Sequence, residues 1–145
     1  DGCGYRLQRP LLSGQADADG ILRVPHRAAG TPIQMDGMRV FSMGVRKMTH
    51  ILQRALDEAG LPLEDVALIV PHQANQRIMD AIAKKLNLPP ERFFSNIQRF
   101  GNTSSNSIPL ALTELFASAL RPDNIALTAF GGGFTYGACI LTPAP

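Results

Sequence analysis

The apolar run at residues 66–70 restricts the fold of this chain more than any other feature. Its sequence is Val-Ala-Leu-Ile-Val, and Pro71 follows it directly. A continuous apolar run of this length is typical of a strand that is buried on both faces, as in a sheet covered by helices. Proline cannot donate a ladder hydrogen bond, so it ends the strand. The run therefore predicts a sheet between helical layers.

Three segments with helical periodicity surround this strand. The first begins near Val40 and ends at Gly60, because glycine is the usual residue just past a helix end. The second covers about residues 75–86, and the third follows the polar turn at residues 101–106 and continues to about Leu120. Their apolar residues recur at spacings of three and four, which places them on one face of each helix. These helices are the expected covering layers.

Two further strands are predicted near the end of the sequence, over residues 124–130 and 134–141. Only a run of three glycines separates them, and a connection this short joins antiparallel neighbours. Residues 93–97 are predicted as one more short strand, and residues 31–37 as a short strand and turn. The order of elements predicts an α/β fold, with helices layered on a mixed sheet that ends in an antiparallel strand pair.

The first 32 residues show no sustained period. They are rich in Gly, Pro, Asp and Arg and predict loops with at most one short strand. We divide the chain into this loop-rich entry, residues 1–32, and one domain, residues 33–145. The whole length of 145 residues is enough for one domain with a single core.

Composition and charge exclude several classes of protein. The chain is 45% hydrophobic and 18% charged, which is typical of a globular protein. A net charge of +2, from 14 basic and 12 acidic residues, is too balanced to favour nucleic acid. No apolar run approaches the roughly 18–20 residues of a membrane span, and no secretion leader is visible. We therefore expect a cytoplasmic protein that binds neither nucleic acid nor a membrane.

The cysteines and histidines do not form a metal-binding pattern. Cys3 and Cys139 are far apart, and together with His26, His50 and His72 they lack metal-ligand spacing. We expect no metal site. The two thiols either form one long-range disulfide or stay reduced, and an intracellular chain favours the reduced form.

Three polar or glycine-rich segments each lie at a strand end or helix start. His72 directly follows the buried strand, where sites in open α/β sheets lie; it is either an acid, base or donor, or a structural histidine. Asn102 is either a turn or cap residue, or an amide donor aimed at developing negative charge. The glycines at residues 131–133 form either a simple turn or a place where a ligand or bare N–H comes close. Taken singly, each segment leaves both interpretations open.

Together the three segments resemble one family. The chain carries in order His72-Gln73-Ala74-Asn75-x-Arg77, then Gly101-Asn102-Thr103-Ser104, then Phe130-Gly131-Gly132-Gly133-Phe134-Thr135-Tyr136-Gly137. This series resembles the C-terminal half of 3-oxoacyl-[acyl-carrier-protein] synthase III, a condensing enzyme with the thiolase fold. The resemblance extends from about Ala18 to Leu141, and residues 1–17 match less well. It implies that the fold is a thiolase-like half.

The resemblance implies an acyltransferase of fatty acid or related biosynthesis. In this family a cysteine takes an acyl group from coenzyme A, malonyl-carrier protein loses carbon dioxide, and the enolate attacks the thioester in a decarboxylative Claisen condensation. His72 and Asn102 then take the roles of the catalytic histidine and asparagine, as neutral donors to the enolate oxygen. Because the donor must be neutral, we expect the pKa of His72 to be lowered in a partly buried site.

The resemblance also assigns binding residues. Gly132 resembles the loop that supplies or supports a backbone N–H near the acyl-thioester oxygen. Gly37, Phe41 and Asn75 resemble positions that line the pantetheine tunnel for coenzyme A. Arg77 resembles a docking residue for the acyl carrier protein, which fits a local excess of basic residues around it. Coenzyme A thioesters are substrates here, and no cofactor is expected.

The family's nucleophilic cysteine is expected outside this chain, in an N-terminal half. Cys3 lies much closer to His72 than the family's cysteine lies to its histidine, and Cys139 falls inside the last predicted strand. Neither has the cationic or helix N-terminal setting that activates a thiolate. The fragment alone is therefore expected to be inactive for condensation, with the cysteine-bearing half and a second protomer of a homodimer as partners.

Three positions depart from the family pattern. Met38 replaces a common asparagine, which alters the expected tunnel wall, and Ser105-Asn106 replaces two small alanines, which bears on acyl-chain preference.

One alternative function is a non-catalytic thiolase-like module that binds the carrier protein, and another is a decarboxylase that does not condense. As half of a thiolase fold, the chain should expose an apolar face that its twin half normally covers.

Overall fold

A computed structural model describes residues 4–23 and 32–144, and its centre is a five-stranded mixed sheet. Along the sheet the order is β1-β7-β6-β5, and β2 also pairs with β7. The strands are β1 (Tyr5–Leu7), β2 (Leu11–Gly14), β5 (Leu68–Pro71), β6 (Ile125–Gly131) and β7 (Thr135–Pro143). β5 and β6 are parallel, whereas the other pairs are antiparallel. The predicted mixed sheet and its terminal antiparallel pair are confirmed.

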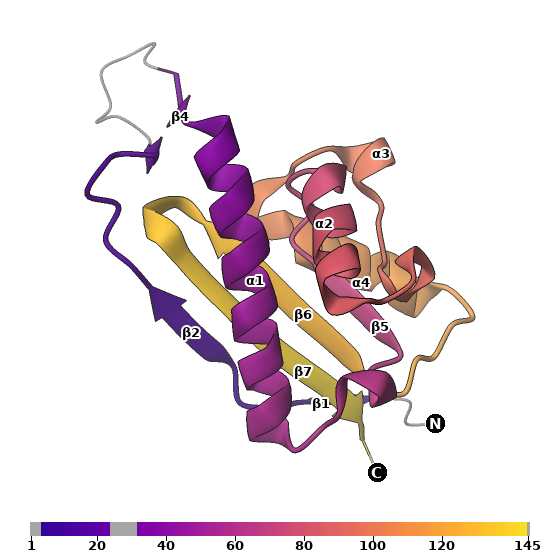
Figure 1. Cartoon of the computed structure of the whole chain (residues 1–145). Coiled ribbons are helices and arrows are strands. Elements are labelled where there is room, and N and C mark those ends of the chain that lie inside the picture. Colours follow the sequence, from indigo (N-terminus) through magenta and orange to yellow (C-terminus); the bar gives the residue numbers. More distant parts are fainter. Residues whose placement is uncertain (1–3, 24–31, 145) are drawn as a thin grey trace.

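The long helix α1 (Gly37–Ala59) covers one face of the sheet across β6 and β7 (Figure 1). It begins three residues before the predicted start, because the Asp36 side chain accepts a hydrogen bond from the Arg39 N–H at 3.1 Å and caps the first turn. It ends at Gly60, which has φ 62°, as predicted. Buried side chains of α1 and the sheet form the larger core: Met48, Ile51, Leu52, Ala55, Ala126, Phe130, Ala138 and Ile140.

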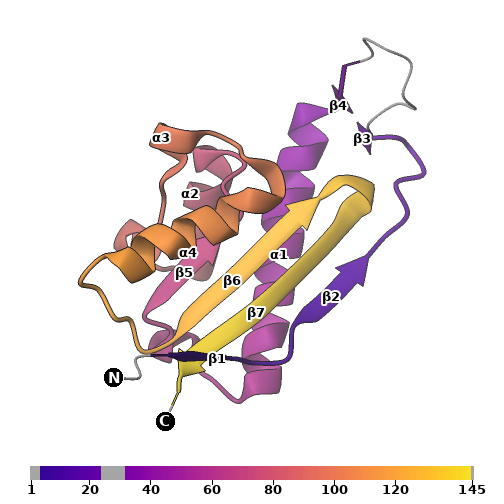
Figure 2. The same ribbon diagram turned by 180° about the vertical axis from the view of Figure 1, so that it is seen from behind.

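The other helices complete the layers. α2 (Gln76–Leu86) packs beside α1, and α4 (Ser107–Ala117) lies on the opposite face against β5 (Figures 1 and 2). A second core cluster joins α4 to the sheet through Val70, Ala111, Leu115, Ile125 and Leu141. Short elements connect these layers: α3 (Ile97–Phe100) and the 3-10 turns η1 (Leu63–Asp65), η2 (Pro90–Arg92), η3 (Ser104–Asn106) and η4 (Gly132–Phe134). None of the described helices has the length and apolar character of a membrane span.

The prediction was incomplete in the first part of the chain. Residues 5–14 form β1 and β2, and a small separate sheet joins β3 (Leu22–Arg23) to β4 (Gln34–Met35). At most one short strand was predicted within residues 1–32. β1 and β2 were missed because they are short and pair with β7, at the other end of the sequence. β4 lies within the short strand and turn predicted at residues 31–37. Cys3, His26 and Thr31 lie outside the described residues.

Two further boundaries differ from the prediction. The strand predicted at residues 93–97 is wrong: only Phe93 makes a bridge, to Ile69, and α3 begins at Ile97. α4 ends at Ala117 rather than near Leu120. Ser118 stops it, since its hydroxyl donates to the Leu115 carbonyl at 2.6 Å while its backbone leaves the helical region.

Candidate active site

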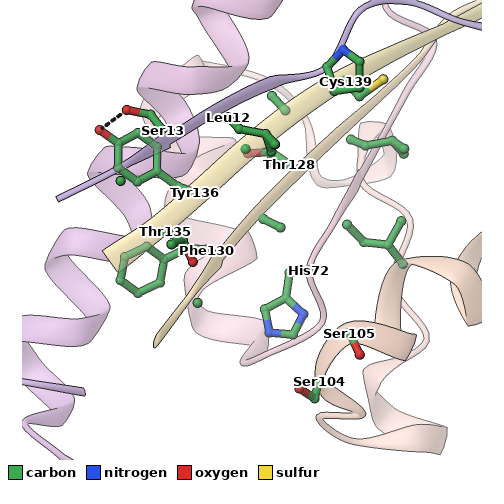
Figure 3. A pocket seen from close by; sticks show the side chains of 18 residues that line it. Leu12, Ser13, His72, Ser104, Ser105, Thr128, Phe130, Thr135, Tyr136 and Cys139 are labelled. Carbon is green, nitrogen blue, oxygen red and sulfur yellow. Dashed lines mark hydrogen bonds between the residues drawn. The ribbon is translucent and has the colours of Figure 1, made fainter. Parts of the chain in front are cut away.

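His72 lies where the sequence predicted it, directly after the buried strand β5. Its backbone N–H donates to the Thr128 carbonyl of β6 at 2.8 Å, which extends the parallel pairing by one residue. The ring therefore leaves the sheet at the carboxyl end of β5, beside the middle of β6. Figure 3 shows it pointing into a hollow on the sheet, with Ser104 and Ser105 beside it. This is the edge at which sites form in α/β sheets.

The surroundings of His72 favour a neutral imidazole. The ring is half-buried, and burial lowers the pKa of His72 from its ordinary value, because a charged ring loses hydration there. Its Nδ1 lies 2.6 Å from the Ser107 hydroxyl oxygen. The expected direction of the pKa shift is confirmed. A neutral ring keeps one N–H for donation and has no net charge.

The hollow around His72 has a volume of about 730 Å³, and its lining includes Ile108 of α4 but no residue of α1, so it lies on the face of the sheet opposite α1. α4 covers only part of this face (Figure 2). Leu12 of β2 stands on the uncovered part with 85% of its surface exposed. The lining combines apolar and hydroxyl groups, among them Leu12, Ser104, Ser105, Ile108, Thr135 and Cys139. The chain thus exposes an apolar part of its sheet, as its resemblance to half of a thiolase fold predicted.

Asn102 forms the turn before η3. Its Oδ1 accepts a hydrogen bond from the Ser104 N–H at 2.9 Å, and its side chain is exposed and does not line the hollow. The turn interpretation is therefore realised. Because Oδ1 is occupied, the Nδ2 amide group is the free end of the side chain, and no partner for it lies among the residues the structure describes. The donor role expected for Asn102 would use this Nδ2 group.

The glycine run divides between two hollows. Gly131 lines the hollow of His72, whereas Gly132 and Gly133 line a second one beside the loop at residues 17–23. Gly133 has φ 69°, a left-handed conformation that favours glycine. A Cβ at Gly132 would meet no atom within 4 Å. This half of the fold therefore supplies no steric reason for glycine at position 132.

Of the four predicted tunnel and docking residues, three lie together between α1 and α2. The Arg77 guanidinium carbon lies 5.8 Å from the centre of the Phe41 ring, within cation–π range. Asn75 caps α2, accepting a hydrogen bond from the Arg77 N–H at 2.9 Å. Gly37 is the exposed first residue of α1, next to Met38, which is 86% exposed. The structure thus brings Phe41, Asn75 and Arg77 together, but none of them lines the hollow of His72.

Cys139 lies on β7 with a free thiol. The sulfur contacts the Gln8 carbonyl at 3.3 Å, and burial raises the pKa of the thiol. A protonated thiol is a poor nucleophile, which agrees with the prediction that Cys139 is not the nucleophile. The sequence did not show that it lines the same hollow as His72. Among the described residues, no cluster of His, Cys, Asp and Glu could hold a metal ion.

Sequence reasoning missed Ser107. A serine before an apolar helical stripe is usually a cap, but here it is the first residue of α4, is 2% exposed and contacts His72. The two residues are 35 positions apart. Only the fold brings them together, so no local sequence signal could have identified the pair.

The layered half-fold, the half-buried histidine at the strand edge and the Asn102 turn define a thiolase-like domain of the condensing-enzyme class. Residues 56–142 match the family described as 3-Oxoacyl-[acyl-carrier-protein (ACP)] synthase III C terminal, and the chain belongs to this family.

Individual relatives agree with this assignment. The Beta-ketoacyl-[acyl-carrier-protein] synthase III of Nitratidesulfovibrio vulgaris is 41% identical over 97% of this chain and 47% of its own length. That of Aquifex aeolicus is 48% identical over 75% of this chain and 36% of its own length. The crystal structure of the Pseudomonas aeruginosa synthase III superposes with a TM-score of 0.87 at 38% identity, covering 96% of this chain and 45% of that one. The chain spans less than half the length of these relatives.

Proposed function

We propose that this chain is the C-terminal catalytic half of a 3-oxoacyl-[acyl-carrier-protein] synthase III-type acyltransferase. The reaction is a decarboxylative Claisen condensation of an acyl-CoA with malonyl-carrier protein. The observation that carries the proposal is the half-buried His72 ring, with lowered pKa, directed into the hollow at the end of β5. Membership of the family supports it.

His72 and Asn102 act in the decarboxylation. The bond between the malonyl carboxylate and the adjacent carbon breaks, carbon dioxide leaves, and the electron pair becomes an enolate with negative charge on the thioester oxygen. The His72 ring N–H and the Asn102 Nδ2 group donate hydrogen bonds to that oxygen. Removing one donor of this kind typically lowers kcat by about 10²–10³. A lowered pKa keeps His72 neutral, so it stabilises the charge without giving up its proton.

The second carbon centre comes from an acyl thioester on a cysteine in the N-terminal half. The enolate carbon attacks its carbonyl, the carbon–carbon bond forms, and the cysteine thiolate leaves. Gly132 supplies or supports a backbone N–H near that carbonyl oxygen. Open space around Gly132 supports this role, because a thioester or the other half of the fold can approach the backbone there. No cofactor takes part, and coenzyme A thioesters enter as substrates.

Substrate arms reach the site along the cluster of Phe41, Asn75 and Arg77. Gly37 and Phe41 on α1 and Asn75 on α2 line the pantetheine path, and Arg77 docks the acyl carrier protein. Arg77 is exposed, and Lys84 and Lys85 in the last turn of the same helix add positive charge. Such a surface attracts an acidic partner.

The apolar sheet face beside α4 is the contact surface for the N-terminal half. The exposure of Leu12 supports this assignment. Among the residues that the structure describes, the one thiol is Cys139, and its raised pKa makes it a poor nucleophile, so the nucleophile is assigned to that half. The fragment alone is therefore inactive for condensation, and the complete enzyme forms a homodimer.

The test uses the full-length protein that contains this chain. Condensation and malonyl-carrier decarboxylation are measured in wild type, His72→Ala, Asn102→Ala and His50→Ala, where His50 is an exposed histidine of α1. The first two variants should lose about 10²–10³ in kcat for both reactions while His50→Ala retains wild-type rates. Unchanged turnover in His72→Ala and Asn102→Ala would reject the function.

A further inference from the structure

The hydroxyl of Ser107 connects the ring of His72 to the backbone. Ser107 Oγ lies 2.6 Å from His72 Nδ1, and the same oxygen accepts a hydrogen bond from the Gln73 N–H at 3.3 Å. Ser107 is 2% exposed, so water does not compete freely for these groups. The Ser107 hydroxyl oxygen thus connects the first residue of α4 to both the His72 ring and the Gln73 backbone N–H.

The two neutral forms of the imidazole satisfy this hydroxyl differently. If the proton is on Nε2, Nδ1 is an acceptor and the Ser107 O–H donates to it, while Ser107 Oγ accepts from Gln73. The His72 Nδ1 atom, the Ser107 hydroxyl and the Gln73 N–H are then all paired. If the proton is on Nδ1, Ser107 Oγ receives two N–H donors and its own O–H needs another acceptor. The structure offers that hydroxyl no other acceptor among the residues it describes.

A buried hydroxyl without an acceptor is unfavourable. The Nδ1-protonated form is therefore disfavoured, and the imidazole proton is held on Nε2. The Gln73 N–H matters because it occupies an acceptor site of Ser107 Oγ and so orients the serine O–H toward the ring. With Nδ1 engaged by Ser107, Nε2 is the nitrogen left to act in the hollow into which the ring points (Figure 3).

We propose that Ser107 is a positioning residue that fixes the Nε2-protonated tautomer and the orientation of His72, so that an N–H donor faces the hollow before substrate binds. Its catalytic consequence rests on the proposed function, since a donor is needed there only if an oxyanion develops in the hollow. The tautomer itself does not depend on that function and can be measured without substrate.

The direct test is nitrogen NMR of histidine-labelled full-length protein at a pH above the ordinary histidine pKa, with His72→Gln used to assign the His72 signals. Wild type and Ser107→Thr, which keeps the hydroxyl, should show an unprotonated Nδ1 and a protonated Nε2. Ser107→Ala should shift both signals toward an average of the two tautomers. Thr113→Ala removes a hydroxyl from the exposed side of the same helix and should match wild type. A protonated Nδ1 in wild type overturns the proposal without any variant, as does an unchanged pattern in Ser107→Ala.

Kinetics separate this proposal from the proposed function. In Ser107→Ala, kcat for malonyl-carrier decarboxylation should fall about fivefold with little change in KM, and Ser107→Thr should restore it. If wild type shows the Nε2-protonated form but no decarboxylation, the proposed function fails and the tautomer assignment stands. If wild type is active and Ser107→Ala changes neither the tautomer nor kcat, the role of Ser107 is rejected while the proposed function stands.

Discussion

The guanidinium of Arg77 lies over the ring of Phe41, 5.8 Å from its centre, and this contact joins the N-terminal parts of α1 and α2. It places a fixed positive charge beside the residues assigned to the pantetheine path. Under the proposed function, the carrier protein would dock at the place where its pantetheine arm enters.

Reversing this charge should weaken carrier docking selectively. We expect Arg77→Glu to raise KM for malonyl-carrier protein about tenfold and to leave KM for acyl-CoA within about twofold, because the acidic partner is repelled while the hollow is unchanged. Arg46→Glu, on the exposed side of α1, is the matched control and should have little effect. Steady-state kinetics with both substrates provide the measurement. Equal KM for the carrier in wild type and Arg77→Glu would contradict the docking role.

The lowered pKa of His72 makes a prediction about stability and pH. Between the folded pKa and the ordinary value of about 6.5, the unfolded chain binds more protons than the folded one, so stability rises with pH in that window. The free energy of unfolding should therefore fall on acidification from about pH 6.5 and level off below the folded pKa. Urea unfolding at several pH values should show this loss in wild type and a smaller one in His72→Gln. Parallel curves for the two proteins would contradict the assignment.

Much of the fold could be predicted because the signals were local. The apolar run before Pro71 and the glycine at position 60 mark a strand end and a helix end by their own chemistry. By contrast, β2 exists because Leu11 pairs with Ala138, and no pattern within four residues reveals such a distant partner.

Predictions for the site also divide between local sequence signals and contacts with distant residues. The sequence placed His72 at the strand edge and left Asn102 between a turn and a donor. The structure shows that Asn102 makes the turn, with its amide nitrogen left for the donor role. Ser107 could not be predicted, because its significance depends on burial and on a contact with a residue in another segment.

Two adjacent glycines provide a matched pair of variants. Gly133 has φ 69°, so Gly133→Ala should lower the free energy of unfolding by about 1–2 kcal/mol. Gly132 is not in the left-handed region, and a Cβ added to it would have no atom within 4 Å, so Gly132→Ala should change stability by less than about 0.5 kcal/mol. Condensation by Gly132→Ala should nevertheless fall, because the methyl group enters the space assigned to the thioester. Urea unfolding and condensation rates measure the two effects, and wild-type turnover in Gly132→Ala would remove Gly132 from the site.

The exposed sheet face should matter to the complete enzyme but not to this half. Leu12 is 85% exposed, so Leu12→Asp removes almost no buried contact within the chain, and its stability should stay within about 0.5 kcal/mol of wild type. Under the proposal that the N-terminal half covers this face, the same change would bury an unpaired carboxylate in the complete protein, which is strongly unfavourable. We expect Leu12→Asp to abolish association of the two halves when they are produced as separate chains.

Gln53→Asp, which adds the same charge on the exposed side of α1, should leave association intact. Co-purification of the halves measures this, and equal recovery with Leu12→Asp and Gln53→Asp would show that the N-terminal half does not cover this face.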